Sequence, residues 1–355
     1  MSSFTFESQA SRVVFGAGCF AQAMVELDRL GATRVMLVST PGRSSLAESA
    51  RAMLGGRIVE SFERAVAHVP QAIALAAREA ASSSRADCIV ALGGGSAIGV
   101  AKAVALSTTL PILAVPTTYG GSEMTPIWGL TTEGRKETGR NPRVQPRVVI
   151  YDPDLTLGLP PRTTACSGLN AVAHCVEALY AADANPLTSL AAQEGIRLLS
   201  RALPNLVTAP SDGEERSAAL RGAWLAGFSL GTVQMALHHK LCHTIGGSFD
   251  LLHAETHAVL LPYTAAYNRA AAHGAMESVS RALDGGDTPT RLHALGRAIG
   301  APLSLREIGM HEEDLDRAAE LAVARQYPNP RAVTREGISE LLVAAFTGDE
   351  AYLSD

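Results

Sequence analysis

The first 116 residues alternate short apolar runs with amphipathic stretches, and this alternation constrains the fold more than any other feature. Two runs, Cys88–Leu92 and Pro111–Val115, are apolar throughout. Strands that are apolar on both faces are typical of a parallel sheet covered by helices on both sides. The stretches between the runs have the spacing of amphipathic helices. The N-terminal part therefore predicts an α/β unit with a parallel sheet.

The predicted elements of this part follow from the same pattern. The expected strands are Arg12–Phe15, Arg34–Ser39, Arg57–Phe62, Cys88–Leu92 and Pro111–Val115. The expected helices are Phe20–Leu30, Ser45–Leu54, Pro70–Ala81 and Ala97–Leu106. Gly31 ends the first helix, and Pro70 stands in the first turn of the third, where its missing N–H costs nothing.

The character of the chain changes at Tyr151–Pro161, which holds three prolines and a glycine. Beyond it, Ala- and Leu-rich segments with helical periodicity follow one another. They are 163–183, 186–203, 213–247, 253–272, 288–299, 312–326 and 334–347. We therefore expect two domains, an α/β domain over 1–158 and an all-helical domain over 159–355.

Composition excludes several classes of protein. A net charge of −5 gives no reason to expect nucleic acid as a partner. The apolar stretches are interrupted before they reach the length of a membrane span, and residues 1–6 lack the layout of a signal peptide. Five widely spaced cysteines fit reduced thiols better than a disulfide framework. We expect a cytoplasmic protein and, from the frequency of such assemblies, a homodimer.

A glycine cluster follows the first fully apolar run directly. Gly93, Gly94, Gly95 and Ser96 precede a predicted helix, so backbone amides and the helix dipole meet at one point. Three consecutive glycines exceed what a tight turn needs, and they predict a phosphate-binding loop. Thr117 and Thr118 follow the next strand, where ligands bind in open α/β sheets. A plain turn and a solvated loop are the competing interpretations.

The end of the second predicted strand bears on the choice of cofactor. An acidic residue there commonly binds the adenosine ribose and excludes a 2′-phosphate. This chain has Ser39 and Thr40 instead, and Arg43 is a candidate phosphate partner that is more simply a surface residue. If this part of the chain binds a dinucleotide, the sequence does not enforce NAD over NADP, and Ser39 is a candidate contact.

Half of the ten histidines fall within twenty residues of the helical part. They are His238, His239, His243, His253 and His257, and His174 lies in another predicted helix. The pairs His239/His243 and Asn170/His174 have i,i+4 spacing, which places both members on one helix face. Together they predict a metal or proton-transfer site. For His238 and His257 a structural role is equally open.

Several long motifs carry a family resemblance from about residue 10 to about residue 350. GGGSAIGVAK, PTTYGGSEMT, NAVAHCVEALY and HHKLCHTIGGSFDLLHAETHAVLLP resemble the iron-containing alcohol dehydrogenase superfamily. RVVFGAG and YPNPRAVTREGI resemble, more narrowly, the maleylacetate reductases within it. The resemblance implies a Rossmann-like dinucleotide-binding domain and a helical domain, with the active site in the cleft between them.

The resemblance also implies a ligand set. Metal-dependent members hold one divalent ion with an Asp and three His, and these positions fall on Asn170, His174, His239 and His253. A carboxamide in place of a carboxylate leaves four neutral ligands, which bind a divalent cation much more weakly. Maleylacetate reductases are metal-independent members, so we expect no metal here. A metal held by the three histidines is the competing interpretation.

The activity implied by the resemblance is NAD(P)H-dependent reduction of the C=C bond of maleylacetate, or chloromaleylacetate, to 3-oxoadipate in aromatic-compound catabolism. His243 is the expected acid, and Asn170, His174, His239 and His253 are expected to line the pocket. The expected partners of this dicarboxylate substrate are Lys240, Arg162 and Arg331, and Lys136 is a candidate cofactor contact. The alternatives are a metal-dependent alcohol or polyol dehydrogenase, a dehydroquinate-synthase-like lyase, and a dinucleotide sensor with a decayed site.

Overall fold

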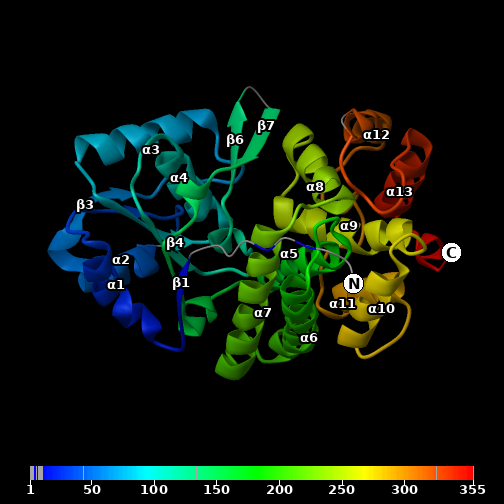
Figure 1. Ribbon diagram of the computed structural model, residues 1–355, viewed down its shortest axis with the longest axis horizontal. Helices are drawn as coiled ribbons and strands as arrows, with labels where there is room; N and C mark the ends of the chain where they lie inside the picture. The colour runs from blue at the N-terminus through cyan, green and yellow to red at the C-terminus, as the bar shows by residue number, and fades with distance from the viewer. Residues whose placement is uncertain are drawn as a thin grey trace. The chain divides into compact units, whose positions relative to one another are not determined.

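The structure is a computed structural model that describes Phe4, Phe6 and residues 11–42, 44–132, 135–324 and 326–354. Arg43, the candidate phosphate partner, lies outside the described residues. The chain divides into two compact units, Ser8–Leu159 and Pro160–Asp355 (Figure 1). The parallel sheet and the helical C-terminal part confirm the predicted fold class.

The first unit contains a parallel sheet of six strands in the order β1-β8-β5-β4-β2-β3. The strands are β1 (Arg12–Phe15), β2 (Val35–Val38), β3 (Ile58–Phe62), β4 (Cys88–Gly93), β5 (Ile112–Pro116) and β8 (Val148–Tyr151). The five predicted strands are confirmed. Sequence reasoning missed β8, a four-residue apolar run that stands directly before the proline-rich turn.

Helices cover both faces of this sheet (Figure 1). They are α1 (Ala23–Leu30), α2 (Ser44–Leu54), α3 (Gln71–Ser83) and α4 (Gly95–Ser107). Apolar side chains of α1 and α2 share one core cluster with Val35, Leu37 and Val90, which alternate along their strands. Helix α4 begins at Gly95, two residues before the predicted start, because Gly94 takes the N-cap position.

The chain order of the strands creates a switch point in this sheet. From β2 the chain continues to the edge strand β3, whereas from β4 it continues to β5 on the opposite side. The strands β2 and β4 are neighbours, and the loops that follow them therefore run in opposite directions. In open α/β sheets such a divergence leaves a crevice at the carboxyl ends of the strands, where ligands bind. Ser39 and Gly94 stand at these two ends.

A two-stranded antiparallel hairpin is a further addition that sequence reasoning missed. It consists of β6 (Ile127–Thr132) and β7 (Arg135–Arg140). The charged sequence of β7 hides its strand character. The buried Lys102 of α4 anchors the loop before β6, because its Nζ donates to the carbonyls of Ser122, Thr125 and Ile127 at 2.6, 2.8 and 2.8 Å.

The second unit is helical. Its helices are α5 (Pro161–Tyr180), α6 (Pro186–Thr208), α7 (Gly213–Thr232), α8 (Leu237–Ser248), α9 (His253–Asn268), α10 (His273–Ala282), α11 (Thr288–Ala298), α12 (Leu315–Val323) and α13 (Arg335–Thr347). The expectation of one continuous segment over 213–247 is wrong, since α7 ends at Thr232 and α8 starts at Leu237. Sequence reasoning also omitted the ten-residue helix α10.

Helix α5 occupies the centre of this unit and packs against α6, α7 and α9. It is buried almost along its whole length, so polar residues on it point into the protein. All five cysteines of the chain are buried, and none of them forms a disulfide bond. Within the described residues, no helix combines the length and the apolar character needed to cross a bilayer.

Candidate active site

The N-terminus of α4 has the geometry of an anion site. Gly93 adopts φ +148°, which L side chains rarely tolerate, and a Cβ on Gly94 would lie 2.9 Å from atoms of the Thr118 side chain. Glycine at 94 lets the loops after β4 and β5 approach one another, and glycine at 93 leaves room for Ala97 in the first turn of α4, 3.0 Å from where a Cβ would lie. No side chain caps α4, so its first-turn amides face outward with the helix dipole behind them.

The other predicted cofactor contacts lie around this loop. The Thr117 backbone N–H donates to the Gly93 carbonyl at 3.1 Å, which ties the two strand ends together. Ser39 follows β2, and its Oγ is buried with no hydrogen-bond partner in the described structure. A buried hydroxyl without a partner is uncommon and fits a site that awaits a polar ligand. Lys136 lies on β7 of the hairpin, away from these strand ends in the chain.

Helices α5, α8 and α9 bring the predicted histidines together. His174 on α5 stacks on His239 of α8 with ring centroids 4.9 Å apart, and His243 stacks on His253 of α9 at 5.6 Å. His239 also meets His257 edge to face at 4.9 Å. The cluster therefore includes every histidine of the predicted site, and it adds His238 and His257, whose roles the sequence left open.

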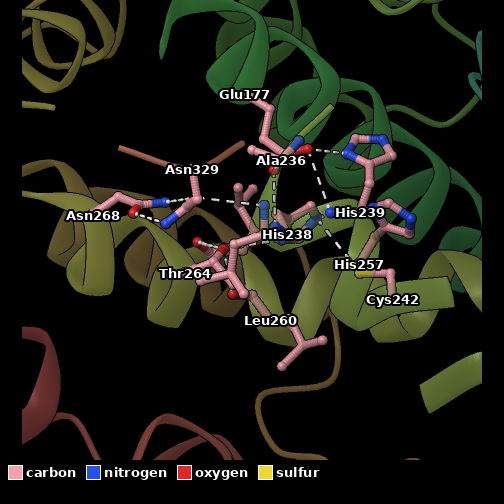
Figure 2. A network of polar contacts seen from close by, with 12 residues as sticks. Glu177, Ala236, His238, His239, Cys242, His257, Leu260, Thr264, Asn268 and Asn329 are labelled. Atoms are coloured by element: carbon pink, nitrogen blue, oxygen red, sulfur yellow. Dashed lines mark hydrogen bonds and ion pairs between the residues drawn. The ribbon is translucent and has the colours of Figure 1, made fainter. Parts of the chain in front are cut away.

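Sequence reasoning missed Glu177, a buried carboxylate that contacts His239 of this cluster (Figure 2). One of its oxygens accepts from the backbone N–H groups of Ala236 and His238, at 3.1 and 2.8 Å. The other contacts Nδ1 of His239 and accepts from its backbone N–H at 3.3 Å. The signal was present in the sequence, because Asn170, His174 and Glu177 are spaced four and three residues apart on one helix.

A second hydrogen-bond chain fixes His238 and His257 (Figure 2). The Thr264 hydroxyl donates to the carbonyls of its own helix, so it accepts from Nδ1 of His238 at 2.9 Å. Nε2 of His238 is then free to accept from Nδ1 of His257, also at 2.9 Å. The Nε2 atom of His257 is left as a buried lone pair without a partner in the described residues.

Burial controls the charge of three of these imidazoles. It lowers the pKa of His174, His238 and His257 well below the usual range, and the neighbouring imidazoles lower each of them further. These rings are therefore neutral at pH 7. At each nitrogen, these three neutral rings present either an N–H or a lone pair, depending on the partner.

The residues matched to the family's metal ligands fit an iron site poorly. The carboxamide of Asn170 supplies no negative charge, although its Oδ1 is buried and lacks a partner among the described residues. Within the described ranges, one group of three His, Cys or acidic side chains has its ligand atoms within 4.8 Å of one another, and it consists of His238, Cys242 and His257. His174, His239 and His253 do not form such a group. In the group that does form, the two ring nitrogens already share a hydrogen bond.

The structure gives the three predicted carboxylate-binding cations different surroundings. Arg162 forms a two-point ion pair with Glu255, at 2.6 and 3.0 Å, so its charge is already balanced. Arg331 lies over the ring of Tyr267 at 4.2 Å and donates to the Tyr267 carbonyl at 3.3 Å. Lys240 is half-buried on α8, next to His239. Binding of substrate by any of the three stays a prediction.

Comparison with known proteins decides the family. Residues 10–153 match the iron-containing alcohol dehydrogenase family, and residues 164–346 match the C-terminal region of the same family. The chain belongs to the iron-containing alcohol dehydrogenase family. The resemblance predicted from its motifs is thereby confirmed, and with it the class of enzyme, an oxidoreductase that uses NAD(P)H.

Within this family, the chain is similar to maleylacetate reductases. It is 53% identical to the maleylacetate reductase of Burkholderia cepacia, over 98% of this chain and 99% of that one. It is 51% identical to that of Sphingobium indicum, over 97% and 98% of the two chains. The crystal structure of maleylacetate reductase from Rhizobium sp. strain MTP-10005 matches with a TM-score of 0.93 and 48% identity, covering 98% of this chain and 99% of that one.

Proposed function

We propose that this protein is a maleylacetate reductase that uses NADH or NADPH to reduce the C=C bond of maleylacetate to 3-oxoadipate. The observation that carries the proposal is an identity of about 50%, over nearly the whole chain, to proteins named as maleylacetate reductases. The carboxamide of Asn170 supports it, because a neutral group at this buried position suits a dianionic substrate, which a carboxylate there would repel.

The reaction places clear demands on the site. NAD(P)H, which the loop before α4 would hold, would supply the hydride that forms a C–H bond at the alkene carbon β to the ketone, and it would be oxidised to NAD(P)⁺. The π electrons move toward the ketone oxygen, which gains the negative charge of an enolate. A proton then bonds to the adjacent carbon and restores the ketone. The site must therefore donate hydrogen bonds to an oxyanion and supply one proton.

The side chains of the cluster can meet these demands. Asn170 offers two N–H donors from its amide, one of the few neutral groups that can do so. Loss of one such oxyanion donor costs on the order of 3 kcal/mol in the transition state. His243 is half-buried at one side of the cluster and is proposed as the proton donor. His174, His239 and His253 line the pocket, and Lys240, Arg162 and Arg331 are the candidate partners of the substrate carboxylates.

We also propose that the reaction needs no metal. The neutral donor set and its poor convergence support this. The test is oxidation of NADH by maleylacetate with and without a chelator, together with elemental analysis of the purified protein. Unchanged turnover in chelator is expected. Tightly bound iron or zinc, with turnover lost when it is removed, would favour the alternative of a metal-dependent alcohol or polyol dehydrogenase.

The observation in favour of that alternative is that Asn170 Oδ1, His174 Nδ1 and His239 Nε2 are buried polar atoms without a hydrogen-bond partner in the described residues. Asn170→Asp sharpens the test, because it restores the negative charge of the metal-dependent relatives. We expect the variant to take up metal and to lose maleylacetate turnover, since a buried carboxylate repels the substrate. Unchanged turnover without metal uptake would contradict the role given to Asn170.

A further inference from the structure

Glu177 makes two kinds of contact at the start of α8, one with backbone N–H groups and one with a histidine side chain. Its side chain is 1% exposed, and one oxygen accepts from the backbone N–H groups of Ala236 and His238. These N–H groups belong to the first turn of α8, where a helix lacks internal acceptors. The other oxygen lies against the His239 side chain at Nδ1.

This second contact determines the tautomer of His239. A carboxylate oxygen only accepts hydrogen bonds, so Nδ1 of His239 must carry the proton. In the neutral ring, Nε2 then holds a lone pair. That atom is buried and has no hydrogen-bond partner in the described part of the chain. The ring lies between His174 and His257, so the lone pair belongs to the interior of the cluster.

We propose that Glu177 is a positioning residue, which holds His239 as the Nδ1–H tautomer and leaves the Nε2 lone pair available to the histidine cluster. The effect on turnover rests on the proposed function, whereas the tautomer does not. In this state His239 accepts hydrogen bonds and donates none to a substrate carboxylate. Donation to the substrate then falls to Asn170 and His243, and His239 supplies the complementary acceptor beside them.

Glu177→Gln tests the proposal, because the amide has one oxygen and one NH₂ group. The oxygen is expected to remain with Ala236 and His238, because their two N–H groups lie at 3.1 and 2.8 Å. The opposite orientation would set the NH₂ group against both of these donors, whereas this one sets it against the single, longer contact of the His239 backbone N–H, at 3.3 Å. The NH₂ group then faces Nδ1 of His239 and donates to it. The ring must move its proton to Nε2, so the variant is expected to reverse the tautomer while it preserves the anchor of α8.

The readout is the ¹⁵N NMR spectrum of protein labelled at histidine, which distinguishes the two tautomers through the shifts of the ring nitrogens. Wild-type protein should show His239 with Nδ1–H, and Glu177→Gln should show it with Nε2–H. We expect kcat to fall about 10²-fold, in the range of a lost acid–base arrangement. The KM for maleylacetate should not rise, because the reversed ring presents an additional N–H donor to the substrate.

Asp183→Asn is the matched control. Asp183 is exposed and accepts from the backbone N–H of Gln234 at 3.0 and 3.2 Å, in the same connection before α8, but it does not touch the cluster. Its loss should leave the tautomer and kcat unchanged. Glu177→Asp is the second variant, for use if Glu177→Gln fails to fold. It keeps an acceptor-only group, so it should retain the Nδ1–H tautomer of His239.

Four results would overturn the proposal. The first is Nε2–H on His239 in the wild-type protein. The second is an unchanged tautomer in Glu177→Gln, and the third is a reversed tautomer with unchanged kcat. The fourth is a KM that rises for both substrates together with a lower kcat in Glu177→Gln and Asp183→Asn alike, which would show a purely structural anchor. Absence of maleylacetate turnover in the wild type would instead contradict the proposed function and leave the tautomer measurement valid.

Discussion

The two units build their candidate sites from different materials. In the α/β unit, backbone amides, glycines and hydroxyls at the ends of β2, β4 and β5 form the predicted cofactor site, and the unit contains a single histidine, His68. In the helical unit, side chains from three helices form the cluster, and the buried Thr264 and Glu177 hydrogen-bond the rings of His238 and His239. Side chains added to its glycines should therefore disturb the first site. Protonation of its histidines, or loss of their hydrogen-bond partners, should disturb the second.

The largest expected difference concerns stability in mild acid. Burial keeps His174, His238 and His257 neutral in the folded protein, whereas in the unfolded chain they bind protons near pH 6.5. The unfolded state therefore binds more protons, and the free energy of unfolding falls as the pH drops below 6.5. The slope is about 1.4 kcal/mol per pH unit for each histidine, or at most about 4 kcal/mol for three.

Urea denaturation at pH 6.5 and 5.5, followed with a probe in each unit, measures this slope. His257→Asn should reduce it by about a third, because one of the three titrating rings is removed. An equal loss of stability in the α/β unit, where the three rings are absent, would break the comparison between the units.

The second prediction concerns chemistry within the cluster. His243→Ala should lower kcat by about 10²-fold or more, because it removes the proposed proton donor. The Kd for NADH should stay within about 2-fold, since the predicted cofactor contacts lie in the other unit. Steady-state kinetics and NADH fluorescence titration give the two quantities. An equal loss of cofactor affinity would indicate a general disturbance of the fold rather than a missing acid.

The sequence predicted the glycine loop more fully than the contacts within the histidine cluster, for a physical reason. The glycine loop is local, so strand, loop and helix N-terminus could be placed from Gly93–Ser96 alone. The break between α7 and α8 could not be placed, because Glu177, 59 positions before Ala236, captures the N–H groups at the start of α8. The pairing of His238 with His257 and Thr264 was likewise beyond reach, since it depends on how two helices pack.

The third prediction tests the chain of contacts that ends at His257. Thr264→Val removes the acceptor of the His238 Nδ1–H and leaves a buried donor unpaired, which costs about 1–3 kcal/mol. Thr256→Val is the matched control on the same helix, because Thr256 is equally buried and, within the described part of the chain, its hydroxyl donates to the Leu252 carbonyl and contacts no imidazole. Its expected cost is below about 1 kcal/mol. Chemical denaturation of both variants measures the difference, and equal costs would contradict the proposed direction of the chain.

The smallest expected effect belongs to the glycine loop. Gly94→Ala places a Cβ 2.9 Å from the Thr118 side chain, so the loops after β4 and β5 must separate. A strain of about 1.4 kcal/mol, within the range for overpacking, corresponds to a KM for NADH that is about 10-fold higher. The value of kcat should change little, because the histidine cluster is untouched.

Gly95→Ala separates packing from ligand approach in the same loop. Its Cβ would meet no protein atom within 4 Å, and its φ is not in the left-handed region, so Tm should be unchanged or slightly higher. A phosphate bound at the first turn of α4 comes close to the backbone, and an added methyl group there would obstruct it. A raised KM for NADH at unchanged Tm would therefore show that the ligand itself needs the glycine. If both variants bind NADH as well as the wild type, the start of α4 is not where the cofactor binds. The α/β unit would then have no cofactor site formed by the backbone of this loop to compare with the histidine cluster.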